Sequence, residues 1–240
     1  EYEEFIAQLV TAEEAIKNIH DGDKVVMSFG CGEPRAIVRA MRENYKNYNN
    51  VEIINQDIMK ADLKAIIEEK CKDMKIAVCA NLPYYITSPI IMMFLESKLP
   101  ITSITVMVQK EAADRLCAEV GSRDGGAVTV AVNYYAESEI LFFVPKDSFL
   151  PPPKVDSSVI KLTLRDNPPV EVKNEEFFFK VVKAAFSQRR KTAENSISAG
   201  LSIPKADVKD ALEKAGLSAT VRAEKMTMED FATLSEILEK

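Results

Sequence analysis

Between residues 24 and 120 the sequence alternates short apolar runs with segments of helical periodicity. The apolar runs have the length and composition of buried strands. They are KVVMSF (24–29), VEIIN (51–55), MKIAVCA (74–80) and TSITVMVQ (102–109). Helical patterns occupy residues 9–20, 35–48, 61–71, 88–97 and 110–120. This alternation predicts an α/β fold built on a doubly wound, largely parallel sheet.

The pattern changes after residue 121. Residues 121–164 carry short β-rich runs separated by turn signals, which predict antiparallel strands finishing one edge of the sheet. Tyr134 and Tyr135 fall within these alternating runs, so we expect them in strands with their rings in the core. Beyond the NPP break at 167–169 only helical patterns remain, and Gly200 and Gly216 are expected as C-caps at helix ends.

The composition excludes several classes of protein. The longest apolar runs are far too short to span a bilayer, and the chain opens EYEEFIAQ, without the leader of a secreted protein. The four cysteines are scattered and there is one histidine, so we expect no metal site and the reduced thiols of a cytoplasmic protein. A net charge of −6 argues against indiscriminate nucleic-acid binding, although a local basic patch is compatible with it.

The stretch ANLPYYITSPI (80–90) directly follows the apolar run MKIAVCA. Ligands of a doubly wound sheet bind beyond the carboxyl ends of its strands, where an amide oxygen can accept from an amine and a tyrosine ring can stack on a base. The candidate groups at strand ends are Gly30 and Gly32, Asp57, and Asn81 with Tyr84. Alone, Asp57 and Asn81 would be interpreted as helix caps. The adjoining Pro83 and the tyrosines favour a nucleobase site.

With these residues the sequence resembles the ribosomal RNA adenine dimethyltransferases of the KsgA/Erm type. The likeness extends from about Val51 to Lys240 through motifs in the same order. They are NQDIMKADL (55–63), NLPYYITSPI (81–90), VQKEAADRL (108–116), SFLPPPKVDSSVIKL (148–162), AFSQRRKT (185–192) and RAEKMTMEDFATLSEIL (222–238). The resemblance implies a Rossmann-like class I methyltransferase core over 51–167 and a small helical RNA-binding domain over 168–240.

The resemblance also implies a reaction, which is the transfer of two methyl groups from S-adenosyl-L-methionine to N6 of adenines in small-subunit rRNA. The implied catalytic residues are Asn81, Leu82, Pro83, Tyr84 and Phe149. The implied cofactor-binding residues are Gly30, Gly32, Asp57, Ile58 and Asn81. The implied partner is small-subunit rRNA or the immature small ribosomal subunit, and the protein is expected to act as a monomer.

Arg189, Arg190 and Lys191 form the densest basic run of the chain. By itself such a run is most simply a solvated helix face. Combined with an adenine site, it becomes a candidate contact for rRNA phosphates.

The first fifty residues fit this family poorly. Gly30 and Gly32 imitate its Gly-rich loop, but only 26 residues separate Gly30 from Asp57, which leaves no room for the family's second strand and its ribose-binding acid. Residues 9–53 instead resemble the N-terminal part of acetyl-CoA hydrolases and 4-hydroxybutyrate CoA-transferases. We therefore expect a fusion near 50–53 and an impaired cofactor site. The alternatives are a catalytically silent RNA-binding or ribosome-binding module and, third, a CoA-transferase fragment.

Overall fold

The computed structural model describes residues 16–18, 24–27, 35–47, 52–55, 60–71, 76–149 and 152–239. In the first part of the chain, two four-residue strands pair in parallel: β1 (Lys24–Met27) and β2 (Glu52–Asn55). The helices described around them are η1 (Ile16–Asn18), α3 (Arg35–Glu43), η3 (Tyr45–Asn47) and α4 (Leu63–Lys70). Both strands and the helices near 35–48 and 61–71 were predicted from periodicity. Of the helix predicted over 9–20, only the short η1 lies within the described residues.

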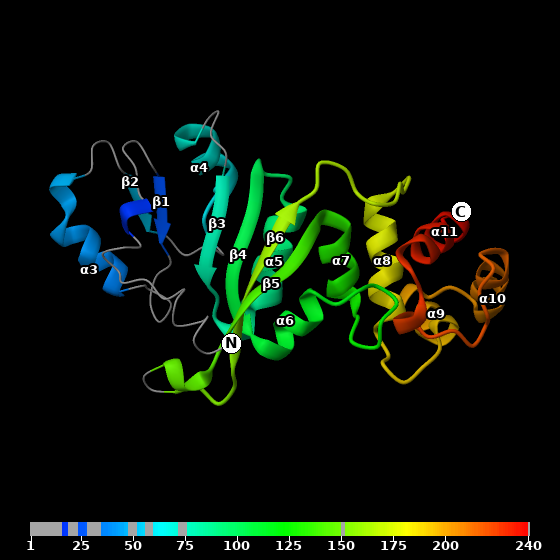
Figure 1. Cartoon of the computed structure of the whole chain (residues 1–240). Coiled ribbons are helices and arrows are strands. Elements are labelled where there is room, and N and C mark those ends of the chain that lie inside the picture. The colour runs from blue at the N-terminus through cyan, green and yellow to red at the C-terminus, as the bar shows by residue number, and fades with distance from the viewer. Residues whose placement is uncertain are drawn as a thin grey trace.

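The main sheet has four strands in the order β3-β4-β6-β5. They are β3 (Ile76–Asn81), β4 (Ile101–Gln109), β5 (Ala136–Val144) and β6 (Ser157–Leu164). β3 and β4 are parallel, whereas β6 pairs antiparallel with both β4 and β5. The sequence predicted one sheet. The structure divides it, with β1 and β2 forming a separate two-stranded sheet beside β3 (Figure 1).

The helix α5 (Thr87–Glu96) connects β3 to β4, and α6 (Lys110–Leu116) follows β4 directly. One face of α5 carries Ile90, Ile91, Phe94 and Leu95, all of which are buried. They pack in one core with the inward-facing residues of β4 and β6, so the helix covers the sheet in the way that parallel α/β units require. This core holds the carboxyl ends of β3 and β4 in place.

Residues 127–135 form a helix, α7 (Ala127–Tyr135), where strands were predicted. The sequence AVTVAVNYY is rich in β-branched residues, which lower helix propensity by only a few tenths of a kcal/mol each. Burial decides the outcome: Val130 and Val132 are at most 1% exposed, and the Thr129 hydroxyl donates to the Arg115 carbonyl while accepting from the Gly126 N–H. The rings of Tyr134 and Tyr135 nevertheless lie in or against the core, as predicted.

The C-terminal part is helical, as predicted. Its elements are α8 (Glu175–Ala185), α9 (Ala193–Leu201), α10 (Lys205–Lys214), η6 (Ala223–Lys225) and α11 (Met228–Leu238). Side chains of Asn174, Thr192 and Thr227 cap α8, α9 and α11 by accepting hydrogen bonds from backbone N–H groups of the first turn. These caps fix where each helix begins.

The helical domain and the sheet have separate hydrophobic cores that meet at α7. Val130, Ala131 and Tyr134 pack with the C-terminal helices, while Val132 packs with the sheet. Figure 1 accordingly shows α7 standing between the sheet and α8. At this junction the Tyr135 hydroxyl donates to the Glu175 carboxylate at 2.8 Å. The position of the helical domain relative to the sheet is therefore set by α7.

Gly216 adopts φ +76° just beyond α10, so it ends that helix in the way predicted from the sequence. The prediction for Gly200 was wrong. Gly200 lies inside α9, where an added Cβ would stand 2.7 Å from Cβ of Ala184 on α8. It is a glycine because the two helices approach closely, and Ser202, at φ 56°, caps α9 instead.

No helix in the described ranges has the length and apolar character needed to cross a membrane. Among the same residues, no group of three or more histidine, cysteine, aspartate or glutamate side chains is arranged to hold a metal ion.

Candidate functional site

The motif 81–84 lies where β3 ends. Asn81 is the last residue of the strand and pairs with Met107 on β4, and the Leu82 N–H continues the ladder by donating to the Met107 carbonyl at 3.2 Å. The Leu82 side chain is anchored in the sheet core at 6% exposure. The backbone on either side of the Asn81 carboxamide is therefore fixed by the sheet.

Two acceptors at this strand end have no partner among the described residues. The Asn81 side chain is exposed and makes no hydrogen bond within that part of the chain. The Leu82 carbonyl likewise accepts none from it. The next carbonyl, that of Pro83, is occupied by the Ile86 N–H at 3.1 Å and the Thr87 hydroxyl at 3.2 Å. The described residues thus satisfy one acceptor and leave its two neighbours open to a donor.

Tyr84 begins the single-turn helix η4 (Tyr84–Ile86) and is half-buried. Its hydroxyl lies 2.8 Å from the hydroxyl of Ser157, the first residue of β6. Ser157 is fully buried, so the contact ties the ring to the sheet. Sequence reasoning gave Ser157 no role, because nothing in the local pattern marks a partner for a residue 73 positions away.

Phe149 lies in the loop between β5 and β6, after the short helix η5 (Lys146–Ser148), and is half-buried. Val144, the last residue of β5, pairs with Ser157, the first residue of β6. Ser157 also pairs with Gln109, the last residue of β4, so this loop lies at the end of the sheet where β3 and β4 finish and Tyr84 follows. The rings of Tyr84 and Phe149 do not contact each other within the described residues. The role of Phe149 at the site, implied by the family resemblance, stays a prediction.

An open groove of about 350 Å³ lies beside this edge, between the start of α6 and the segment Lys154–Asp156. Its charges are mixed. Lys110 donates to Asp114 at 2.9 Å, and this hydrogen bond raises the pKa of the Lys110 amine. Asp156 accepts from the Lys146 N–H at 3.0 Å, which fastens the β5–β6 loop. We interpret the groove as a polar margin of the strand-end site.

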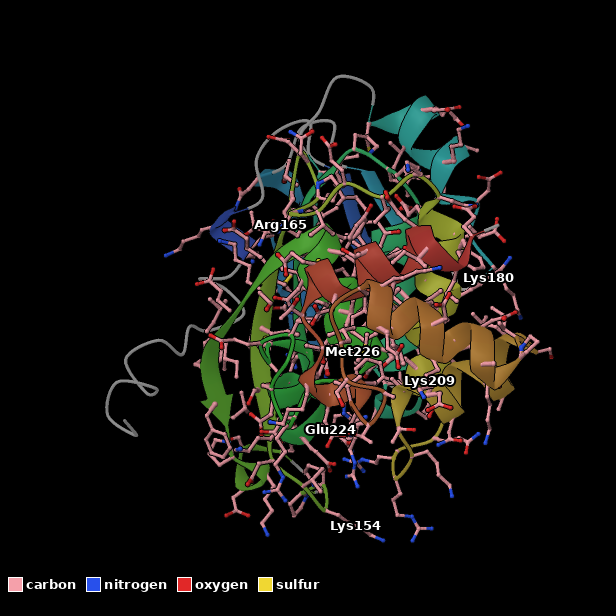
Figure 2. All side chains as sticks on the ribbon, turned by 90° about the vertical axis from the view of Figure 1, so that its right-hand side faces the viewer. Lys154, Arg165, Lys180, Lys209, Glu224 and Met226 are labelled. Carbon is pink, nitrogen blue, oxygen red and sulfur yellow. The ribbon has the colours of Figure 1, made fainter. Side chains whose placement is uncertain are left out.

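The basic run Arg189–Lys191 lies in the turn between α8 and α9, and all three side chains are exposed. Within the described part of the chain none of them forms an ion pair, so their charges are available to a ligand. In both views this turn and the β5–β6 loop extend to the lower side of the molecule (Figures 1 and 2), toward which β3 points in Figure 1. The structure thus brings the basic run and the strand-end site to one side.

Four of the predicted cofactor-binding residues, Gly30, Gly32, Asp57 and Ile58, lie outside the described residues. β1 and β2, which precede them, are described as a parallel pair. Their carboxyl ends therefore lie side by side, which is the relation that a shared site after these two strands requires.

A model of the family described as ribosomal RNA adenine dimethylase matches residues 34–240 of the chain. The chain belongs to this family. It is accordingly an rRNA adenine dimethyltransferase, an enzyme whose cofactor is S-adenosyl-L-methionine.

Several bacterial relatives, each named ribosomal RNA small subunit methyltransferase A, are similar to this dimethylase. The protein of Lachnoclostridium phytofermentans is 42% identical, with an alignment covering 96% of this chain and 84% of the relative. That of Bacillus pumilus is 46% identical over 83% of this chain and 70% of its own. That of Geobacillus thermodenitrificans is 48% identical, with an alignment covering 80% of this chain and 67% of the relative.

Two solved structures share the fold. A dimethyladenosine transferase from Plasmodium falciparum superposes with a TM-score of 0.65 at 21% identity, covering 93% of each chain. The 23S rRNA methyltransferase ErmE superposes with a TM-score of 0.61 at 24% identity, covering 95% of this chain and 96% of its own. The predicted class, a methyltransferase-like α/β fold with a helical C-terminal region, is therefore confirmed.

The N-terminal limit expected for the family was wrong. The match begins at residue 34 rather than near Val51, and the alignment with the Lachnoclostridium protein covers most of the first fifty residues. The comparisons therefore lend no support to a CoA-transferase segment or to a fusion near 50–53. Short apolar strands such as KVVM and EIIN suit many α/β families, which is why the local likeness misled.

Of the predicted cofactor-binding residues, Asn81 lies within the described ranges, and its position is compatible with cofactor binding. Asn81 presents an exposed carboxamide, without a partner among the described residues, at the carboxyl end of β3, which is where a doubly wound sheet binds its ligands. Asn81 is thus the described residue that could meet both the cofactor and the base.

Proposed function

We propose that this chain dimethylates N6 of adenines in small-subunit rRNA, and that Asn81, Leu82, Pro83, Tyr84 and Phe149 form its base site. The observation that carries the proposal is the pair of open acceptors, the Asn81 carboxamide and the Leu82 carbonyl, beside the anchored ring of Tyr84. The relatives named small subunit methyltransferase A support the choice of RNA. The proposed partner is the immature small subunit, met by a monomer in the cytoplasm.

The two acceptors address the chemical difficulty of the reaction. Adenine N6 is a poor nucleophile because its lone pair is delocalised into the ring. Accepting its two hydrogens at Asn81 and Leu82 favours a geometry in which the lone pair is directed out of the ring plane. S-adenosyl-L-methionine supplies the methyl group. N6 loses one proton to water for each methyl gained, so no strong base is required of a chain with one histidine.

Access to N6 requires the adenine to leave its stack, which costs a few kcal/mol. Stacking of the adenine on Tyr84, with Phe149 on the opposite face, offsets this cost, because each stacking contact between a base and an aromatic ring contributes roughly 1–3 kcal/mol. The bond from Tyr84 to buried Ser157 holds the ring in place before the base arrives, so little side-chain entropy is lost on binding. Pro83 fixes the backbone between the acceptors and the ring.

The basic run Arg189–Lys191 contacts rRNA phosphates in this proposal. Its side chains are exposed and unpaired in the described part of the chain, and the turn that carries them extends to the same side as the β5–β6 loop (Figure 1). With a net charge of −6 on the whole chain, attraction to RNA depends on local basic groups such as this run. Binding is therefore selective for RNA that fits both the run and the base site.

The proposal is tested by methylation of unmethylated small subunits with a labelled methyl donor. Asn81→Ala is expected to lower the rate by roughly 100-fold or more, the scale found when one preorganised hydrogen-bonding group of an active site is removed. Asn47→Ala, on exposed η3, is the matched control and should retain the wild-type rate. Full activity in Asn81→Ala would show that the amine acceptor has been assigned wrongly.

Calorimetry with S-adenosyl-L-methionine separates this proposal from the silent-module alternative and tests for impairment. We expect saturable binding by the wild-type chain. The absence of binding heat, with RNA affinity intact, would favour a catalytically silent RNA-binding module.

A further inference from the structure

Tyr85 is the most exposed large apolar side chain in the described ranges, with 85% of its surface open to solvent. The next in order, Tyr45, is 64% exposed, and the others lie between 41% and 46%. Tyr85 stands within the motif of the candidate site, directly after Tyr84. The base site described above gives it no role.

The geometry of η4 explains the direction of its ring. A 3₁₀-helix has three residues per turn, so successive side chains point about 120° apart. Tyr84 is directed to Ser157 on β6, and Ile86 packs against the core of the sheet. The third direction, taken by Tyr85, leads away from both. The ring of Tyr85 is therefore positioned to contact a partner outside the chain.

The surroundings of Tyr85 are open and chemically suited to RNA. Asn81, Ser88 and Pro89 are exposed on either side of it in the chain. Lys154, from the β5–β6 loop, projects at the lower end of the molecule (Figure 2), the end toward which β3 points in Figure 1, and it forms no ion pair with a described residue. Exposed aromatic rings together with a positively charged surface are the combination by which proteins bind single-stranded nucleic acid.

We infer that Tyr85 is a second stacking contact for RNA, with its ring packed on a nucleotide adjoining the adenine that enters the site. When an adenine swings out, its neighbour loses a stacking partner, and a ring just outside the pocket replaces that partner. Because every base has a π-face, the contact tolerates different flanking sequences. The inference rests on the proposed function, since it requires RNA at this strand end.

The chain contains no tryptophan, which allows a direct test. Tyr85→Trp places the only tryptophan of the chain at the site, and stacking on a base should quench its selectively excited emission when unmethylated small-subunit rRNA is added. The matched control is Tyr45→Trp, on η3 beyond the β1–β2 pair, which should show no quenching (Figure 1). Binding is measured in parallel by the anisotropy of labelled RNA. Unchanged emission from the Tyr85→Trp variant while RNA binds would overturn the inference.

Affinity provides a second readout. Tyr85→Leu and Tyr85→Ala should weaken RNA binding by roughly 5- to 100-fold, the range for loss of one stacked base, whereas Tyr85→Phe keeps the ring and should bind like the wild type. The kcat at saturating RNA, the affinity for S-adenosyl-L-methionine and the melting temperature should stay unchanged in all three. Wild-type affinity in Tyr85→Leu would contradict a stacking role.

These readouts distinguish failure of the inference from failure of the proposed function. A wild-type chain that binds RNA without methylating it overturns the proposed function, while quenching in the Tyr85→Trp variant would still support the stacking contact. If the Tyr85→Trp variant methylates RNA with unchanged emission, the stacking contact alone is overturned. A wild-type chain that binds no rRNA overturns both.

Discussion

The hydroxyl of Tyr84 lies 2.8 Å from the hydroxyl of Ser157, joining positions 73 residues apart in the sequence. The two ends of this bond differ in their access to water, because Ser157 is fully buried and Tyr84 is only half-buried. The bond therefore fixes the ring of the proposed base site from inside the sheet.

This difference predicts unequal effects of removing either hydroxyl. Tyr84→Phe leaves the Ser157 hydroxyl buried without its partner and should lower the free energy of unfolding by about 1–3 kcal/mol. Ser157→Ala leaves the Tyr84 hydroxyl able to reach water and should cost about 1 kcal/mol or less. Urea denaturation of both variants measures the difference. Equal losses would mean that Ser157 finds another partner.

Tyr84 also allows the ring to be separated from its anchor in catalysis. Tyr84→Ala removes the stacking face and should raise the KM for rRNA by roughly 5- to 100-fold. Tyr84→Phe keeps that face, so its KM should rise only a few-fold. Steady-state methylation kinetics give both values. If the two variants were equally impaired, the hydroxyl rather than the ring would be the important group.

The close approach of α8 and α9 predicts a large effect from a single methyl group. Gly200→Ala would place a Cβ 2.7 Å from Cβ of Ala184 and 3.0 Å from its Cα, so the helices must separate, at about 1–3 kcal/mol of stability. Adding Ala184→Gly should restore part of this loss. Gly216→Ala is the control: it meets nothing within 4 Å and should cost only the strain of φ +76°, about 1 kcal/mol. Thermal melting compares the three.

The junction at Tyr135 predicts a loss of stability in alkali. Burial, and next the hydrogen bond to Glu175, raise the pKa of the Tyr135 phenol above its ordinary value near 10. Above about pH 10 the unfolded chain releases this proton while the folded chain keeps it, so the free energy of unfolding falls as the pH rises; below about pH 9 the contribution is constant. In Tyr135→Phe the fall should be shallower by up to about 1.4 kcal/mol per pH unit. Identical slopes would contradict a raised pKa of the Tyr135 phenol at the junction.

The basic run predicts a specific change in salt dependence. Arg189, Arg190 and Lys191 are replaced together by alanine. The slope of log affinity for rRNA against log salt concentration should then decrease in magnitude by about 2, since each phosphate contact contributes roughly 0.7 to this slope for a single strand. The control replaces three exposed lysines that pair with acids on their own helices. They are Lys180, Lys209 and Lys214. Figure 2 shows Lys180 and Lys209 away from the lower side where Lys154 projects, so the control should keep the wild-type slope.

The sequence by itself determined the order of strands and helices over most of the chain, the place of Asn81–Tyr84 at a strand end, and the C-cap at Gly216. These features depend on local period, on turn residues and on a motif of contiguous residues, all of which can be recognised without knowing what packs against them. The motif also carried the family, although it did not reveal how far the family extends toward the N-terminus.

Only the tertiary structure decided the rest. Residues 127–135 are helical because burial of Val130 and Val132 outweighs a preference of a few tenths of a kcal/mol per residue. Gly200 serves a helix contact rather than a helix end, and Ser157 anchors a ring 73 residues away. Each of these outcomes depends on atoms distant in the chain, and local propensities are too weak to encode such contacts.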